Sequence, residues 1–242
     1  MTRRNAPHPL AASGRNAKGF TLTEVALAVF VAGLVVAGTL KGTELISQSR
    51  VKGLMADYTG TIAAYHMYTD RYASMPGDDP GVSRRWTSAV GGNGDRQLSG
   101  RFDAAAPASL AAFTVDASGG ETLAFWWHMR LAGLVPGASS GPAAVAQPVN
   151  TYGGLIGVQQ GAYGLAGVTI CLGGLSDYMV AAIDAQLDDN RPGSGSVRTA
   201  ASGSDTPTDL YRETRDDTQR FVLCGAATGG GATAPVVAMA PN

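Results

Sequence analysis

A single carboxylate, Glu24, lies at the start of an apolar run that continues without charge from Val25 to Leu40. Counted from Phe20, the run has the length that an α-helix needs to cross the hydrocarbon core of a bilayer, about 20 residues. An ionised carboxylate in lipid is costly, so it needs a positive partner. We therefore expect Glu24 to pair with a positive group that assembly brings to it.

The residues before this run are basic. Residues 1–19 hold four of the 18 basic residues of the chain and none of its 19 acidic residues. Positive charge before an apolar helix keeps that end in the cytoplasm and sends the rest of the chain outward. Residues 20–242 are left with a net negative charge, which argues against nucleic acid as a partner.

The residues Lys18-Gly19-Phe20, with Glu24 at the fifth position from Phe20 and the apolar run behind it, resemble the prepilin signal of type IV pilins and type II secretion pseudopilins. The resemblance implies that prepilin peptidase cuts after Gly19 and that the new amino-terminal Phe20 is methylated. It also implies that Glu24 neutralises the terminal amine of a neighbouring subunit as helices stack into a filament. The implied partners are prepilin peptidase, other pilin or pseudopilin subunits, an inner-membrane assembly platform and the membrane.

An ordinary secretory signal peptide or an uncleaved signal anchor is the alternative. Residues 35–39 loosely supply a small-residue cleavage site, but this alternative gives Glu24 no role. Many pilins have a helix-kinking proline about twenty residues into the mature chain, and residues 39–42 contain none. The prepilin interpretation anchors the protein in the bacterial inner membrane with its globular part in the periplasm, and later places it in a periplasmic or cell-surface filament.

Cys171 and Cys224 are the two cysteines of the chain. In an oxidising periplasm two lone cysteines most often form a disulfide, and closing a loop of this size stabilises the fold by about 3–4 kcal/mol. Two buried free thiols are the alternative. The cysteines and the three histidines are too few and too scattered for a structural zinc site.

An acidic segment near the carboxy terminus contains Asp184, Asp188 and Asp189 and runs into the turn residues 190–195. Some secretion pseudopilins bind calcium through an acidic loop in this part of the chain, so the resemblance makes the three aspartates calcium candidates. The correspondence is not residue for residue. We therefore favour a solvated turn, with no metal, as the expectation from sequence.

Three further groups of residues could do chemistry, but for each we prefer an interpretation without it. Asp78 and Asp79 lie in the turn 75–80, where aspartates often bond to nearby backbone. His128 follows two tryptophans, a setting more typical of packing than of catalysis. Residues 137–141 have the spacing of a nucleophile elbow but precede a proline instead of a helix. We expect no enzyme activity and no cofactor.

The elements that position these residues follow from periodicity. Apolar residues recur at steps of three and four from Val51 to Tyr72, which predicts that the first helix continues to about residue 74 with this stripe packed on a globular domain. The proline and glycine of the turn 75–80 end it. Shorter elements are predicted to follow: helices over 121–134 and 177–186, strands over 154–158, 163–172 and 220–225, and a polar loop over 196–209.

These elements predict an α+β fold, in which a long N-terminal helix packs on an antiparallel sheet with short extra helices and long loops. The expected parts are a leader (1–19), a transmembrane and assembly helix (20–41), its amphipathic continuation (42–74), a globular domain (75–224) and a flexible tail (225–242). The expected function is that of a minor structural subunit of a type IV pilus-like or type II secretion filament. A membrane-anchored periplasmic binding domain that does not polymerise is the alternative.

Overall fold

The computed structural model describes residues 19–115, 120–208 and 219–227. The expected leader before Gly19 and most of the expected tail lie outside these residues. The chain divides into two compact units, Met1–Ile46 and Ser47–Asn242, and helix α1 (Leu22–Tyr72) runs through the boundary between them. Each unit is described by itself.

The first unit consists of the amino-terminal half of α1. Its large apolar side chains from Phe20 to Val36 are exposed, and an 18-residue window of this helix is apolar enough to cross a membrane by length and composition. A signal sequence passes the same test. The sequence-based expectation of an apolar amino-terminal helix is confirmed.

The second unit contains a four-stranded antiparallel sheet with the strand order β1-β2-β4-β3. β4 is the last of the described strands along the chain, but it lies between β2 and β3. The strand that comes last in sequence therefore occupies an inner position of the sheet. This arrangement confirms the predicted α+β fold. The strands are β1 (Ile156–Gln160), β2 (Val168–Leu175), β3 (Val197–Ala201) and β4 (Phe221–Ala226).

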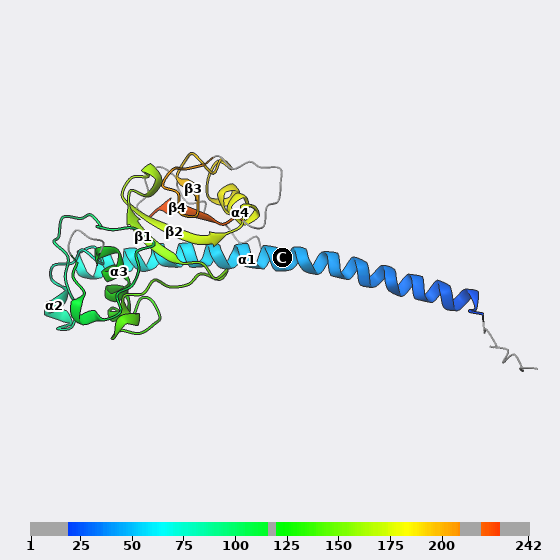
Figure 1. Ribbon diagram of the computed structural model, residues 1–242, viewed down its shortest axis with the longest axis horizontal. Coiled ribbons are helices and arrows are strands. Elements are labelled where there is room, and N and C mark those ends of the chain that lie inside the picture. Colours follow the sequence, from blue (N-terminus) through cyan, green and yellow to red (C-terminus); the bar gives the residue numbers. More distant parts are fainter. Residues whose placement is uncertain (1–18, 116–119, 209–218, 228–242) are drawn as a thin grey trace, which may run out of the picture. The chain divides into compact units, whose positions relative to one another are not determined.

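One face of the sheet packs against α1, whose second half runs alongside β1 and β2 in Figure 1. Leu54 and Tyr58 of α1 share a buried apolar cluster with Ile170 of β2 and Leu223 of β4. A Cβ atom at Gly225 would collide with the Tyr58 hydroxyl, so a glycine there permits the close approach of helix and strand. The apolar stripe that the sequence predicted on the second half of α1 therefore packs against the sheet.

The opposite face of the sheet carries a second cluster, which includes Val222, Cys224 and Cys171. Phe221 and Leu223 belong to the first cluster, so β4 is buried on both sides, which agrees with its uninterrupted apolar sequence. Three further helices complete the unit: α2 (Val82–Arg85), α3 (Gly120–Leu131) and α4 (Asp177–Leu187). Single 3₁₀ turns lie at Leu110–Ala112, Pro142–Ala144 and Ala162–Gly164.

Two predicted elements differ from the structure. The strand expected from Tyr163 begins only at Val168, because Tyr163 adopts a left-handed conformation (φ 54°) within a 3₁₀ turn. The segment expected to be a polar loop contains β3, whose Thr199 and Ala200 are buried against β4. Small and polar side chains gave β3 no apolar alternation, and its position at the sheet edge is set by tertiary pairing.

Candidate functional site

The predicted processing bond joins two residues that precede the helix. Gly19 and Phe20 are non-helical, and α1 begins at Leu22. The side chain of Phe20 is 80% exposed, so neighbouring groups of the described chain do not shield the bond. A peptidase needs an accessible, non-helical backbone, and residues 19–21 are exposed and lie outside the helix.

Glu24 lies in the first turn of α1, where a negative charge is favourable because unpaired backbone N–H groups concentrate there. Its backbone N–H donates to the Thr21 hydroxyl at 3.3 Å, and the Thr21 N–H lies 3.5 Å from Glu24 Oε2. These two contacts form a capping box, in which a threonine and a glutamate three residues later satisfy each other's backbone. Sequence reasoning missed this cap, although Thr-x-x-Glu is its known signature.

The three carboxylates of Asp184, Asp188 and Asp189 come together at the end of α4. One oxygen from each lies within 4.8 Å of the others, although the three side chains differ in exposure. Sequence spacing places Asp184 one helical turn before Asp188, which brings their side chains to the same face. The structure thus gathers the three residues that the resemblance singled out.

Asp184 is fully buried, and neither of its carboxylate oxygens has a hydrogen-bond partner within the described parts of the chain. Burial raises the pKa of Asp184 to about 6, and the negative charges of Asp188 and Asp189 add to the shift. Buried carboxylates normally have hydrogen-bond partners. A buried carboxylate without one would be stabilised by a bound cation or by protonation. A fully solvated turn, favoured from sequence, does not describe this residue.

The other two aspartates organise the loop after α4. Asp188 Oδ2 accepts hydrogen bonds from the backbone N–H groups of Ser196 (2.5 Å) and Val197 (2.9 Å). Asp189 Oδ1 accepts from the Arg191 N–H at 2.9 Å, and its Oδ2 accepts from the Ser194 hydroxyl at 3.2 Å. These bonds hold two carboxylates near Asp184 in spite of their mutual repulsion. Clustered carboxylate oxygens are the ligands that Ca²⁺ prefers.

Cys171 of β2 and Cys224 of β4 form the disulfide predicted from sequence. The two residues are direct partners in the antiparallel register, with Cα atoms 4.1 Å apart. Both are buried. The last strand of the described chain is therefore covalently attached to its neighbour, which indicates an oxidising, extracytoplasmic location for this unit.

The paired aspartates after α1 act within the fold. Asp79 accepts hydrogen bonds from the Tyr68 hydroxyl at 2.8 Å and from the Gly81 N–H at 2.9 Å, and it forms an ion pair with Arg85. Asp78 accepts from two backbone N–H groups of the loop 94–96. The turn interpretation of both residues is confirmed.

His128 of α3 is also structural. Its Nδ1 accepts a hydrogen bond from the Gly77 N–H at 2.9 Å, and its Nε2 lies 2.9 Å from the Val90 carbonyl oxygen, to which it donates. Burial lowers the pKa of His128 to about 4, so the ring is neutral at pH 7 and ties two loops together. Glu121, which sequence reasoning overlooked, also binds the loop that contains Val90, through the N–H groups of Asn93 and Ser99.

No family model matches the chain, and no match was found among the curated proteins or the solved structures. The arrangement of elements is nevertheless pilin-like. A long amino-terminal helix with an apolar first half packs its second half on a four-stranded antiparallel sheet, and a disulfide joins the carboxy-terminal strand to that sheet.

Proposed function

We propose that this protein is a structural subunit of a type IV pilus-like or type II secretion filament. Prepilin peptidase cleaves it between Gly19 and Phe20, and the apolar half of α1 carries it into the filament from the inner membrane. The observation that supports this proposal most directly is the position of Glu24. It is one carboxylate in the first turn of a helix that is otherwise uncharged through Leu40.

Cleavage after Gly19 creates a positive amine at Phe20, four residues before Glu24. In an apolar environment an unpaired amine or carboxylate is costly. Pairing between that amine and the Glu24 carboxylate of a neighbouring subunit lets each charge stabilise the other, which is strongly favourable relative to two separate buried charges. Apolar contacts between neighbouring helices supply the remaining free energy. An assembly platform and companion subunits are the partners that this function requires.

Mass spectrometry of the amino terminus of the membrane-extracted protein tests the processing step. The expected product begins at a methylated Phe20, and Gly19→Ala keeps the leader attached. A chain that begins elsewhere, or a mature product from Gly19→Ala, contradicts the proposal. An intact leader or a cut beyond Ala37 would support the alternative of an anchored periplasmic domain that does not polymerise.

We also propose that Asp184, Asp188 and Asp189 bind a divalent cation, with Ca²⁺ the best match to their oxygen ligands. The supporting observation is that Asp184 is buried with both carboxylate oxygens unpartnered in the described chain, next to two further carboxylates. Three carboxylates leave room for the backbone and water oxygens that complete a Ca²⁺ shell of 6–8 ligands. The cation would fix the loop between α4 and β3.

Calorimetric titration of the EDTA-treated full chain in detergent tests this site. We expect Ca²⁺ to bind and to raise the melting temperature by about 5–10 °C at a hundredfold excess over Kd, because ligation to the folded state alone stabilises by about 2.7 kcal/mol. Asp184→Asn should abolish the Ca²⁺ effect and stabilise the EDTA-treated protein, since it removes an unpartnered charge. The exposed Asp70→Asn serves as the control. No heat and no shift at millimolar Ca²⁺ would overturn the site.

A further inference from the structure

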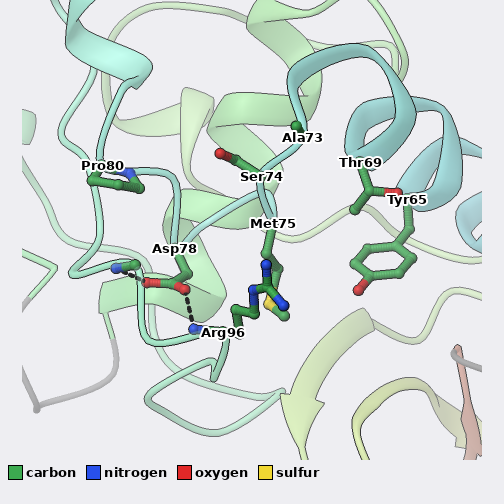
Figure 2. A pocket seen from close by; sticks show the side chains of 9 residues that line it. Tyr65, Thr69, Ala73, Ser74, Met75, Asp78, Pro80 and Arg96 are labelled. Atoms are coloured by element: carbon green, nitrogen blue, oxygen red, sulfur yellow. Dashed lines mark hydrogen bonds between the residues drawn. The ribbon is translucent and has the colours of Figure 1, made fainter.

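A cavity of about 460 Å³ lies between the carboxy-terminal end of α1 and the two loops that follow it. Its size is within the range of small-molecule sites, about 300–1,000 Å³. Its lining includes Tyr65 of α1, three residues of the first loop (Met75, Asp78 and Pro80) and Arg96 of the second loop (Figure 2). The cavity is distant in sequence from Glu24 and does not depend on the filament proposal.

The walls of the cavity are held by buried polar groups. Asp78 Oδ1 accepts a hydrogen bond from the Gly94 N–H at 2.5 Å, and its Oδ2 accepts from the Arg96 N–H at 2.6 Å. His128 binds the backbone of the first loop at Gly77. Because buried side chains hold both loops in place, the cavity is preformed. Ligand binding would therefore cost little conformational entropy in the loops.

The side chain of Arg96 makes no ion pair or ring contact within the described segments of the chain. Its backbone has a left-handed conformation (φ 65°), which is unfavourable for a residue with a Cβ atom and is maintained here by the bond to Asp78. Arg96 and Met75 both line the cavity, and their side chains overlap in the view of Figure 2. Arg96 is exposed, and its backbone is held in place while its guanidinium offers a positive charge with five N–H donors.

Tyr65 contributes a second donor. The residue is 5% exposed and its ring stacks on Phe125 with centroids 6.3 Å apart, so its orientation is fixed. Its hydroxyl has no hydrogen-bond partner in the part of the chain that the structure describes, and Tyr65 lines the same cavity as Arg96 (Figure 2). Burial raises the pKa of Tyr65, so the hydroxyl keeps its proton and can donate it to an acceptor.

We propose that this cavity binds a monoanionic organic acid whose carboxylate accepts hydrogen bonds from the Arg96 guanidinium and the Tyr65 hydroxyl, while its apolar part lies against Met75 and Pro80. A planar carboxylate matches the fork of a guanidinium. A doubly charged anion such as phosphate is disfavoured, because Arg96 is the one cation of the lining and the Asp78 carboxyl stands in the same wall. The carboxylate can belong to a free small acid or to the carboxy-terminal residue of a polypeptide.

The test uses the full chain in detergent with ¹³C-methyl methionine, in which the Met75 signal is assigned from its loss in Met75→Leu. N-acetyl-leucine is titrated as a free acid and acetyl-Gly-Gly-Leu as a peptide with a free carboxy terminus. The amide of each compound is the uncharged control, and inorganic phosphate is the polyanion. We expect saturable shifts of the Met75 methyl signal with at least one acid and none with the amides or phosphate.

Substitutions then assign the donors. Arg96→Gln should weaken binding at least tenfold and Tyr65→Phe about three- to tenfold, in line with the loss of a charge-assisted and a neutral hydrogen bond. The exposed Arg84→Gln should change binding less than twofold. Binding of both acids supports a site for small acids, and binding of the peptide alone assigns the carboxylate to a polypeptide end. Equal binding of acid and amide, unchanged binding by Arg96→Gln, or no Met75 shift up to about 10 mM acid overturns the proposal.

Discussion

Thr21 and Glu24 cap each other at the start of α1. The Glu24 N–H donates to the Thr21 hydroxyl at 3.3 Å, and the Glu24 carboxylate lies 3.5 Å from both the N–H and the hydroxyl of Thr21. The residue proposed to meet a neighbour's amine therefore already has a local role in its own helix. A glutamine at this position can form the same cap, which allows the cap and the charge to be separated.

Glu24→Gln and Glu24→Ala should both be processed at Gly19-Phe20 yet fail to enter filaments, because both lack the charge that pairs with the neighbouring amine. Glu24→Ala should in addition lose about 1 kcal/mol of cap stability, which amide exchange in the first turn of α1 measures. Filament incorporation is measured by recovery of the subunit in sheared or purified filaments. Incorporation of Glu24→Gln at the wild-type level would show that the cap, and not the charge, is the essential property.

The double variant Cys171→Ala/Cys224→Ala should lose about 4 kcal/mol of unfolding free energy, since the disulfide closes a loop with a sequence separation of 53 residues. Denaturant unfolding monitored by tryptophan fluorescence measures the loss. A reductant should destabilise the wild-type protein by a similar amount and leave the double variant unchanged. A double variant as stable as the oxidised wild type would mean that sheet packing alone holds β4.

Acidification should destabilise the domain through His128. The folded-state pKa of this buried ring is about 4, below the ordinary value of 6.5, so the unfolded chain binds a proton that the folded chain does not between these two pH values. Its contribution to stability is complete above pH 6.5 and is lost as pH falls to about 4, a change of about 3 kcal/mol.

The difference in unfolding free energy between wild type and His128→Gln, measured from pH 7 to pH 4, isolates this effect from other titrating groups. Glutamine can still accept from Gly77 and donate to Val90, but it does not titrate. The wild-type curve should fall more steeply than that of the variant. Parallel curves for wild type and His128→Gln would contradict the assigned pKa.

Gly195→Ala should destabilise the protein more than Gly203→Ala. Both glycines have left-handed backbones (φ 79° and 84°), so each substitution costs about 1–2 kcal/mol of backbone strain. A Cβ atom at Gly195 would also collide with the Asp188 carboxylate, whereas the space around Gly203 is open. In EDTA, thermal unfolding should give Gly195→Ala an unfolding free energy at least about 1 kcal/mol below that of Gly203→Ala. Equal values would mean that the loop rearranges to accommodate the added Cβ atom.

Local sequence patterns predicted the elements whose signals are strong. The apolar stripe from Val51 to Tyr72 located the packed half of α1, and the helix predicted over 177–186 corresponds to α4. The disulfide followed from there being two cysteines in the chain and from the expected compartment. These features depend on periodicity, on turn residues or on residue counts, which one sequence displays.

Features that arise from tertiary placement escaped prediction. The burial of Asp184 depends on how α4 lies against β3 and β4. The acidic sequence alone predicted a solvated turn, because it does not show this packing. Arg96 and Tyr65 are far apart in the chain and carry no motif, so only the folded loops bring them to one cavity. β3 is a strand because it pairs with β4, although its own sequence shows no apolar alternation.

The strand order has a consequence for biogenesis. β4 occupies an inner position of the sheet, so β3 has nothing to pair with until residues 221–226 have been synthesised and exported. A chain truncated before Phe221 cannot form a smaller version of this domain, because it loses the central partner of two strands and one of the cysteines. The sheet therefore cannot be completed until β4 is in place between β2 and β3, so pairing of this strand is a single late event in formation of the domain.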